Sequence, residues 1–175
     1  MKHTILLGFM GAGKTSIGKK LAKQTGIRFV DTDQMIEEQT GRAIRDIFAE
    51  DGEEFFRDLE TELLVQLQTE KEPLVIAVGG GLPVREINRC YLKELGKTVY
   101  LKADADTLVT RLRGDTTRPK LMGGDLRERI LSLMEAREEK YLDAADLVYA
   151  TDGKSLYQSV RELQTILFME KTGAE

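Results

Sequence analysis

A glycine-rich segment near the N-terminus has the spacing of a phosphate-binding loop. It reads Gly8-Phe-Met-Gly-Ala-Gly-Lys14-Thr15 and fits the pattern G-x-x-x-x-G-K-[ST] in full. Glycines let successive backbone N–H groups turn toward an anion, and the N-terminus of a following helix adds partial positive charge. Lys14 would supply a point charge to the β- and γ-phosphates, and the Thr15 hydroxyl is a ligand type for Mg²⁺. The segment predicts a nucleotide site; the alternative is a chance glycine-rich turn before a helix.

Two carboxylates follow the next apolar run. Asp31 and Asp33 are two residues apart, so on an extended strand end they would point to the same side. They would emerge at the carboxyl edge of the sheet, where α/β proteins bind ligands. One carboxylate can hold Mg²⁺ through water while the other accepts a proton from an attacking hydroxyl. The alternative is that Asp33 caps the next helix, with Asp31 in the turn.

Two arginines have the chemistry to hold an acidic substrate. A guanidinium binds a carboxylate through two parallel hydrogen bonds. Arg57 is off the stripe formed by Phe55, Leu59, Leu63 and Leu67, so we expect it not to face the same core; its alternative is an ordinary solvated arginine. Arg137 falls on the inward-facing stripe of residues 126–141, where a charge needs a partner. Its alternative is a side chain that reaches from the stripe to solvent.

Two glycine-rich loops complete the candidate site. Gly79, Gly80 and Gly81 follow an apolar run, and ordering three glycines is costly unless the backbone must approach something closely, such as a ligand. The alternative is a plain strand-to-loop turn. Residues 114–125 contain three glycines and a proline and have the length of a functional lid. Within them Arg118 could meet the transferring phosphoryl group; its alternative is an exposed loop arginine.

The elements that must position these residues alternate along the chain. Short β-prone runs lie at residues 3–7, 28–30, 74–78, 98–101 and 146–149, with helical patterns between them. Residues 74–78 are apolar throughout, which is typical of a strand buried on both faces of a parallel sheet. The order predicts βαβ units in a three-layer α/β fold. Residues 33–72 are too many for one crossover helix and predict an inserted subdomain of two or three helices, within a single domain of residues 1–175.

Composition excludes several classes of function. The 175 residues carry 30 acidic and 26 basic side chains, a formal net charge of −4, which argues against a nucleic-acid binder held by bulk charge. Cys90 is the single cysteine and His3 the single histidine, so an internal disulfide and a Cys/His zinc site are excluded. No apolar run approaches the ~20 residues of a membrane helix, and the apolar start is too short for a signal peptide. We therefore expect a soluble, reduced, cytoplasmic protein with no membrane or nucleic-acid partner.

The motif set, in this order and spacing, resembles the shikimate kinase family. The resemblance is carried by the phosphate loop, Asp31-Thr32-Asp33, the run from Gly52 to Arg57, the triple glycine, Arg118-Pro119, Arg137 and Tyr141. It runs to about Tyr141, with a weaker tail. It implies a P-loop kinase fold with sheet order 2-3-1-4-5, and transfer of the ATP γ-phosphoryl group to the shikimate 3-hydroxyl in aromatic amino-acid (chorismate) biosynthesis. A monomer is the expectation from the family.

The resemblance also implies roles for individual residues. Catalysis is assigned to Asp33, Lys14 and Arg118. Shikimate is assigned to Asp33, Arg57, Arg137 and the backbone of Gly79, Gly80 and Gly81, with Phe48 and Phe56 as an apolar wall. ATP is assigned to Gly11, Ala12, Gly13, Lys14, Thr15, Ser16, Arg111 and Arg118. Mg²⁺ is assigned to Thr15 and Asp31, because no aspartate ends the third strand where many P-loop enzymes carry one. Arg113 could replace Arg111 beside the adenine, and Thr151-Asp152-Gly153 is a candidate for its other face.

Three other classes of function compete with this interpretation. A GTPase would carry D-x-x-G and N-K-x-D, and neither pattern occurs in the chain. A related small-molecule kinase, for a sugar acid such as gluconate or for a nucleoside monophosphate, is the first alternative, and Arg57 and Arg137 are the residues that discriminate it. A nucleotide acceptor would need base-reading groups, which the sequence does not show. A nucleotide-binding regulator without turnover would have lost Lys14, Asp33 or Arg118, and all three are present.

Overall fold

The fold is built on five parallel strands with helices between them. The computed structural model describes residues 2–114 and 124–169. The elements, in chain order, are β1 (His3–Leu7), α1 (Lys14–Thr25), β2 (Arg28–Asp31), α2 (Thr32–Thr40), α3 (Ile44–Glu50), α4 (Gly52–Leu67), β3 (Leu74–Ala77), η1 (Leu82–Val84), α5 (Glu86–Leu95), β4 (Gly96–Lys102), α6 (Ala105–Leu112), α7 (Leu126–Ala144), β5 (Leu147–Ala150), α8 (Leu156–Gln164) and the π-helical turn η3 (Thr165–Met169).

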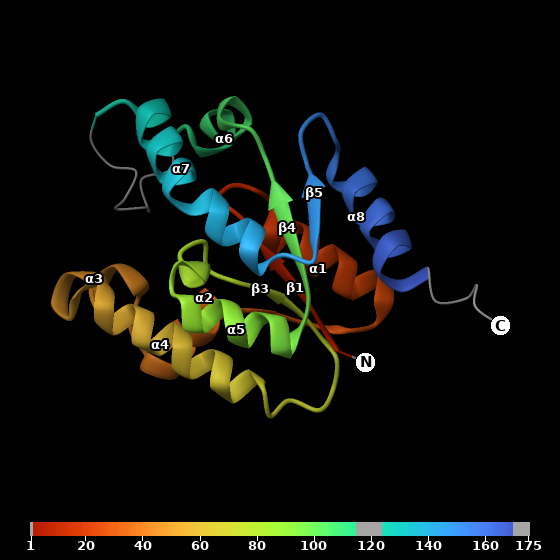
Figure 1. Ribbon diagram of the computed structural model, residues 1–175, viewed down its shortest axis with the longest axis horizontal. Helices are drawn as coiled ribbons and strands as arrows, with labels where there is room; N and C mark the ends of the chain where they lie inside the picture. The colour runs from red at the N-terminus through yellow and green to blue at the C-terminus, as the bar shows by residue number, and fades with distance from the viewer. Residues whose placement is uncertain (1, 115–123, 170–175) are drawn as a thin grey trace.

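The strands form one sheet in the order β2-β3-β1-β4-β5 (Figure 1). Every neighbouring pair is parallel, and Ile5 of β1 lies opposite Ile76 of β3 and Thr98 of β4. The predicted parallel sheet and its order are confirmed. The central strand β1 and its neighbour β3 are buried along their whole length, as strands covered on both faces of a parallel sheet are. The carboxyl ends of the strands therefore meet at one edge.

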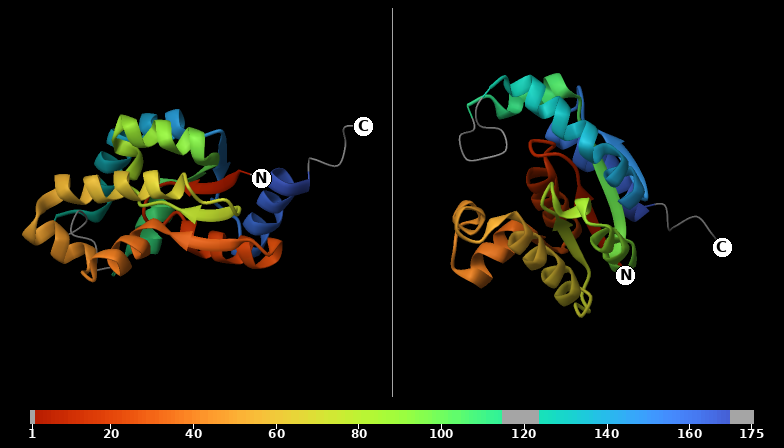
Figure 2. Two further views of the ribbon diagram at one scale, coloured as in Figure 1. Left: turned by 90° about the horizontal axis from the view of Figure 1, so that it is seen from below. Right: turned by 60° about the vertical axis from the view of Figure 1, so that its left-hand side comes forward.

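Helices cover both faces of the sheet, which gives the predicted three layers (Figure 2). Successive β1 residues point to opposite faces, so Leu6 packs with α1 and α8 while Ile5 and Leu7 pack with the helices of the other face. That other face is covered by α4, α5 and α7, which follow one another across the sheet. The only histidine, His3, is buried, and its Nδ1 accepts a hydrogen bond from the backbone N–H of Leu74, which links β1 to β3.

Three helices, α2, α3 and α4, fill the segment between β2 and β3, within the predicted number. Their packing corrects one expectation. The predicted apolar stripe of α4 is rotated by about one residue, because Phe55 is exposed while Phe56, Arg57 and Glu60 are buried. Arg57 therefore faces inward, against the expectation that it would lie off the core. The reason is that Arg57 and Glu60 pair with one another, which lets two charged residues occupy an otherwise apolar face.

Within residues 2–114 and 124–169, no helix has both the length and the apolar character needed to cross a membrane.

Candidate active site

The phosphate loop joins β1 to α1 at the carboxyl edge of the sheet. Gly8, Gly11 and Gly13 have positive φ angles of 149°, 80° and 97°, a region that other residues rarely adopt. A Cβ on Gly8 would also lie 2.5 Å from the carbonyl oxygen of Leu101, so the loop needs glycine there for space as well. The Nζ of Lys14 donates to the carbonyl oxygens of Gly8 and Phe9 at 2.9 and 3.0 Å. The loop thus already curls around the lysine.

Asp31 ends β2 and Asp33 lies in α2, and the two aspartates make different contacts. Asp31 is the N-cap of α2, where its Oδ1 accepts from the backbone N–H of Asp33. Asp31 Oδ2 accepts from the Thr15 hydroxyl at 2.8 Å. Both expectations for this pair were therefore wrong in detail: Asp33 lies in the first helical turn rather than on an extended strand end, and the capping residue is Asp31. The strand ends at Asp31, one residue beyond the predicted run, and the cap starts the helix at Thr32.

One cavity of about 1160 Å³ collects the candidate residues. The residues that line it include Gly11, Ala12, Gly13, Lys14, Thr15, Ser16, Asp31, Asp33, Phe48, Phe56, Arg57, Gly79, Gly80, Gly81, Arg111 and Arg137. Glu60, Thr151 and Lys154 are among its other lining residues. Arg118 lies outside the described residues. The cavity is therefore continuous from the phosphate loop to the buried face of α4.

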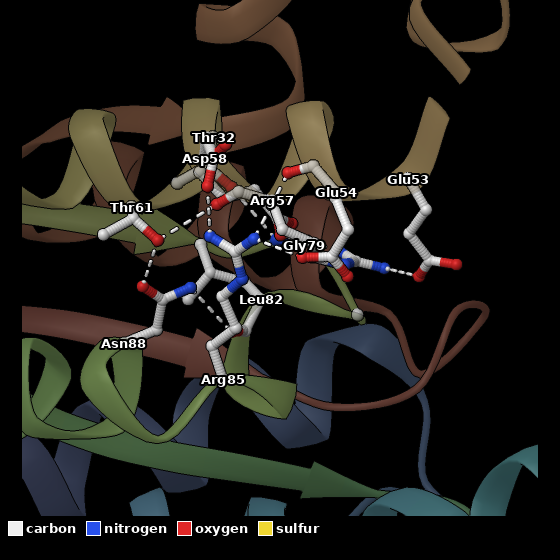
Figure 3. A network of polar contacts seen from close by, with 12 residues as sticks. Thr32, Glu53, Glu54, Arg57, Asp58, Thr61, Gly79, Leu82, Arg85 and Asn88 are labelled. Carbon is white, nitrogen blue, oxygen red and sulfur yellow. Dashed lines mark hydrogen bonds and ion pairs between the residues drawn. The ribbon is translucent and has the colours of Figure 1, made fainter. Parts of the chain in front are cut away.

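Arg57 is held between two carboxylates of its own helix. Its Nη1 donates to Glu60 Oε2 at 2.6 Å and its Nη2 to Glu53 Oε1 at 2.9 Å (Figure 3). The Arg57 side chain is 7% exposed, the Glu60 side chain 0% and the Glu53 side chain 44%. Burial raises the pKa of Glu60 to about 7, although Arg57 lowers it; the charge of Asp33 adds to the increase. The pair therefore places a carboxyl group that titrates near neutrality in the wall of the cavity.

The triple glycine is packed against these charged side chains. The backbone N–H of Gly79 donates to the Thr32 hydroxyl at 3.0 Å. A Cβ on Gly79 would lie 2.5 Å from Asp33 Oδ1 and 2.9 Å from Glu60 Oε1. A Cβ on Gly81 would lie 2.3 Å from Arg57 Nη2. Acidic and basic side chains of the cavity therefore lie close to the backbone of Gly79 and Gly81, and the approach of a ligand to this backbone stays a prediction.

Polar contacts fix α4 to the segment that follows these glycines (Figure 3). Arg85 donates to the carboxylates of Asp58 and Glu54 at 2.6 and 2.7 Å. The Thr61 hydroxyl donates to Asn88 Oδ1 at 2.7 Å, and the buried Asn88 amide donates to the Leu82 carbonyl oxygen. These contacts fix the distance between α4 and the glycine backbone, on which the position of the Arg57 guanidinium depends.

Arg137 reaches the cavity from α7, on the opposite side. It is 5% exposed, its Nη1 donates to the Gly80 carbonyl oxygen at 3.4 Å, and its guanidinium lies 5.9 Å from the centre of the Phe9 ring. The alternative of a side chain that reaches solvent is therefore wrong. Tyr141, one turn along the same helix, donates to the same carbonyl oxygen at 2.6 Å. Two residues of α7 thus hold the backbone of Gly80.

The structure also places the two phenylalanines of the predicted apolar wall and the two arginine candidates for the adenine site. The Phe48 and Phe56 rings lie 4.9 Å apart, and Phe56 is both a core residue and part of the cavity wall. Arg111 lines the cavity and donates to the Gly11 carbonyl oxygen at 3.0 Å. Arg113 is exposed and absent from the lining, which favours Arg111 of the two candidates. Of residues 151–153, Thr151 lines the cavity.

The sequence analysis did not predict Glu60 as a residue of the site, and it predicted no contact for Tyr141. The signal for Glu60 was present, because it stands at an inward position of α4 between Phe56 and Leu63. A charged residue on an inward-facing stripe requires a partner, which is the argument that identified Arg137. Glu60 was missed because the predicted apolar stripe of α4 placed it outside the buried side of the helix.

Comparison with known proteins identifies the family. The family model described as "Shikimate kinase" matches residues 10–167, most of the chain. The chain belongs to the shikimate kinase family. A shikimate kinase of Bacillus anthracis is 44% identical over 164 residues, which cover 94% of this chain and 97% of that protein. One of Persephonella marina is 42% identical over 163 residues, with coverage of 93% and 97%.

Solved structures agree with the family assignment. Shikimate kinase from Acinetobacter baumannii in complex with shikimate has a TM-score of 0.92 at 32% identity, covering 98% of this chain and 96% of that one. The enzyme from Bacteroides thetaiotaomicron has a TM-score of 0.86 at 35% identity, with coverage of 95% and 99%. A gluconokinase from Sinorhizobium meliloti has a TM-score of 0.60 at 18% identity over 92% of this chain and 88% of its own, which shows a shared fold alone.

Proposed function

We propose that this chain transfers the γ-phosphoryl group of ATP to the 3-hydroxyl of shikimate, forming shikimate 3-phosphate for aromatic amino-acid biosynthesis. The observation that carries the proposal is the joining, in one cavity, of a phosphate loop with an aspartate and two buried arginines on the far side. Two guanidinium groups match one substrate carboxylate, which favours a carboxylated acceptor over a nucleoside monophosphate. We further propose that residues 1–175 act as one domain, as a monomer in the cytoplasm.

ATP would bind with its phosphates in the loop from Gly11 to Thr15. The N-terminus of α1 and the inward backbone N–H groups favour the negative charge. Lys14 already lies within the loop and would exchange the carbonyl oxygens of Gly8 and Phe9 for phosphate oxygens. Ser16 would add a hydroxyl at the base of the loop. Arg111 would pack on one face of the adenine, opposite Thr151.

Thr15 and Asp31 would hold Mg²⁺ beside the phosphates. Their oxygens lie 2.8 Å apart at the mouth of the loop, and oxygen ligands are those that Mg²⁺ prefers. No group of three or more acidic, His or Cys side chains in the described part of the chain could hold a metal alone. That suits an ion held by one carboxylate, a hydroxyl, water and the nucleotide. When bound, Mg²⁺ neutralises charge on the transferring phosphoryl group.

Shikimate would lie between α4 and α7. Arg57 and Arg137 would bind its carboxylate, the Gly79–Gly81 backbone would approach the ring, and Phe48 and Phe56 would form the apolar wall. Asp33 would bind the hydroxyls and accept the proton of the attacking one, with its carboxylate beside Gly79. In this arrangement the hydroxyl faces the phosphate loop, and positioning supplies much of the rate.

The test is ADP formation by the purified protein with shikimate, gluconate and nucleoside monophosphates as separate acceptors. The expected result is turnover that requires shikimate, with the product identified as the 3-phosphate by ³¹P NMR. Turnover with gluconate or a nucleotide instead would transfer the proposal to that acceptor. ATP binding without turnover on any acceptor would support a regulator.

A further inference from the structure

Glu60 is a buried carboxyl group that the proposed mechanism does not use. Its side chain is 0% exposed, and one oxygen, Oε2, accepts from Arg57. The other oxygen, Oε1, is buried with no hydrogen-bond partner in the part of the chain that the structure describes. A Cβ on Gly79 would lie 2.9 Å from this Oε1 and 2.5 Å from Asp33 Oδ1, so both oxygens lie close to the same side of the glycine. Leaving a buried carboxylate oxygen without a donor is costly, so this position calls for an explanation.

Charged side chains from three helices lie near Glu60. Among the described residues they include Asp33 from α2, Glu53 and Arg57 from α4, and Arg137 from α7. Tyr141, also from α7, stays a neutral phenol, because burial raises its pKa. The shikimate carboxylate would add a further negative charge in a site where water screens little.

A proton on Glu60 would offset this added negative charge. Of the three carboxyl groups, Glu60 is the fully buried one, whereas Glu53 is half-exposed and screened by water. The protonated Oε1 would become a donor close to the Asp33 carboxylate beside Gly79, and Oε2 would still accept from Arg57. The Glu60 pKa of about 7 means that little free energy is needed to add the proton near neutral pH, and a nearby substrate carboxylate would raise that pKa further.

We propose that shikimate binding is coupled to uptake of a proton by Glu60, so that Glu60 is a positioning residue that presents Arg57 to the substrate as a neutral acid. The proposal rests on the proposed function, since it takes shikimate as the ligand. In the neutral form Glu60 no longer competes with the substrate carboxylate for the charge of Arg57. The consequence is a pH-dependent affinity: shikimate binding weakens as the pH rises through 7, by up to about tenfold per pH unit for one proton.

The test is calorimetry of shikimate binding at pH 7 in two buffers with different enthalpies of ionisation. Nucleotide is left out, because its terminal phosphate also titrates near this pH. The native protein is expected to take up a substantial fraction of one proton. Glu60→Gln copies the neutral acid, with an amide oxygen for Arg57 and an N–H for Asp33, so it is expected to show no uptake and a dissociation constant nearly independent of pH between 6 and 8.

Glu53→Gln is the matched control, because it removes the other carboxylate on Arg57 and should keep the proton uptake. An infrared difference spectrum of the native protein should gain a protonated-carboxyl band when shikimate is added, and this measurement does not depend on any variant folding. Heat of binding that is equal in both buffers, or uptake that persists in Glu60→Gln, would overturn the inference while leaving the proposed function intact. Absence of both shikimate binding and turnover would instead overturn the proposed function.

Discussion

Asp31 and Asp33 can be separated experimentally because Asp31 caps α2. Asp33→Asn removes the proposed base but leaves the cap and the shape of the helix unchanged. We expect kcat to fall by about 10²–10⁴-fold, the usual contribution of a general base, with ATP binding retained. Steady-state kinetics and equilibrium ATP binding on the same sample measure both effects. A variant with near-normal kcat would show that Asp33 only orients the hydroxyl or has no part in the reaction.

Arg137 allows a test of substrate binding alone. Truncating one partner of a buried charged pair costs about 2–5 kcal/mol, so Arg137→Ala should raise the shikimate KM by at least about thirtyfold. The ATP dissociation constant should change little, because the phosphate loop lies on other elements. Lys140→Ala is the control on the same helix, since its partly exposed side chain donates to the Ala136 carbonyl oxygen of α7 and does not line the cavity. An unchanged shikimate KM in Arg137→Ala would remove this arginine from the site.

At the scale of elements, the glycine segment and α4 act as one unit. Gly81 has a φ of −97°, which any residue adopts, so Gly81→Ala adds no backbone strain. Its new Cβ would collide with the Arg57 guanidinium and displace it. Because misplacing a binding group by about 1 Å can cost 10²-fold, we expect the shikimate KM to rise by tenfold or more, with ATP binding unchanged.

A double-mutant cycle shows whether this effect passes through Arg57. In the Arg57→Ala background, Gly81→Ala should cost nothing further, since the group that it displaces is gone. Additive losses in kcat/KM would mean that the alanine acts on the backbone or on another neighbour.

The sequence predicted the elements better than their orientation. The parallel strands can be predicted from the sequence, because runs such as residues 74–78 are apolar at every position, which is typical of a buried strand. Which side of α4 is buried cannot be predicted in the same way, since two overlapping apolar stripes run along the helix. The choice between them depends on whether Arg57 and Glu60 neutralise one another, and that depends on the packing of α4 against other elements.

The candidate site was predictable wherever a motif fixes local geometry. The phosphate loop is such a case, because its glycines and Lys14 act through the backbone that they themselves form. Contacts between distant segments were not predictable: Tyr141 with Gly80, or Arg111 with Gly11, depend on how α6 and α7 lie over the sheet. The capping role of Asp31 was missed for a local reason, since two aspartates two residues apart are equally good caps.

For the whole molecule, Glu60 sets a pH dependence of stability. Its pKa is about 7 in the folded protein and 4.5 as a free side chain, so the folded state binds the extra proton between these values. Raising the pH through this window therefore lowers the free energy of unfolding, by about 3 kcal/mol in all. Glu60→Gln lacks this loss, so its stability relative to the native protein should increase from pH 5 to pH 8.

Urea denaturation of both proteins at each pH measures this difference, with Glu54→Gln as the control on the same helix. Glu54 pairs with Arg85 at the surface, so this variant measures the effect of losing an exposed carboxylate of α4. A constant offset between Glu60→Gln and the native protein would mean that Glu60 is ionised in the fold throughout this range.

The three helices between β2 and β3 also bear on how such a site is inherited. One continuous stretch from Asp31 to Gly81 contributes Asp33, Phe48, Phe56, Arg57, Glu60 and the glycine backbone to the acceptor side of the cavity. Arg137 comes from far along the chain, on α7. A chimera with junctions at residues 30 and 82 would therefore transfer almost the whole acceptor side of the cavity in one recombination event. It would not transfer the second arginine, Arg137. Exchange of acceptor specificity between two kinases of this fold thus takes two separate events, one in the crossover and one in α7.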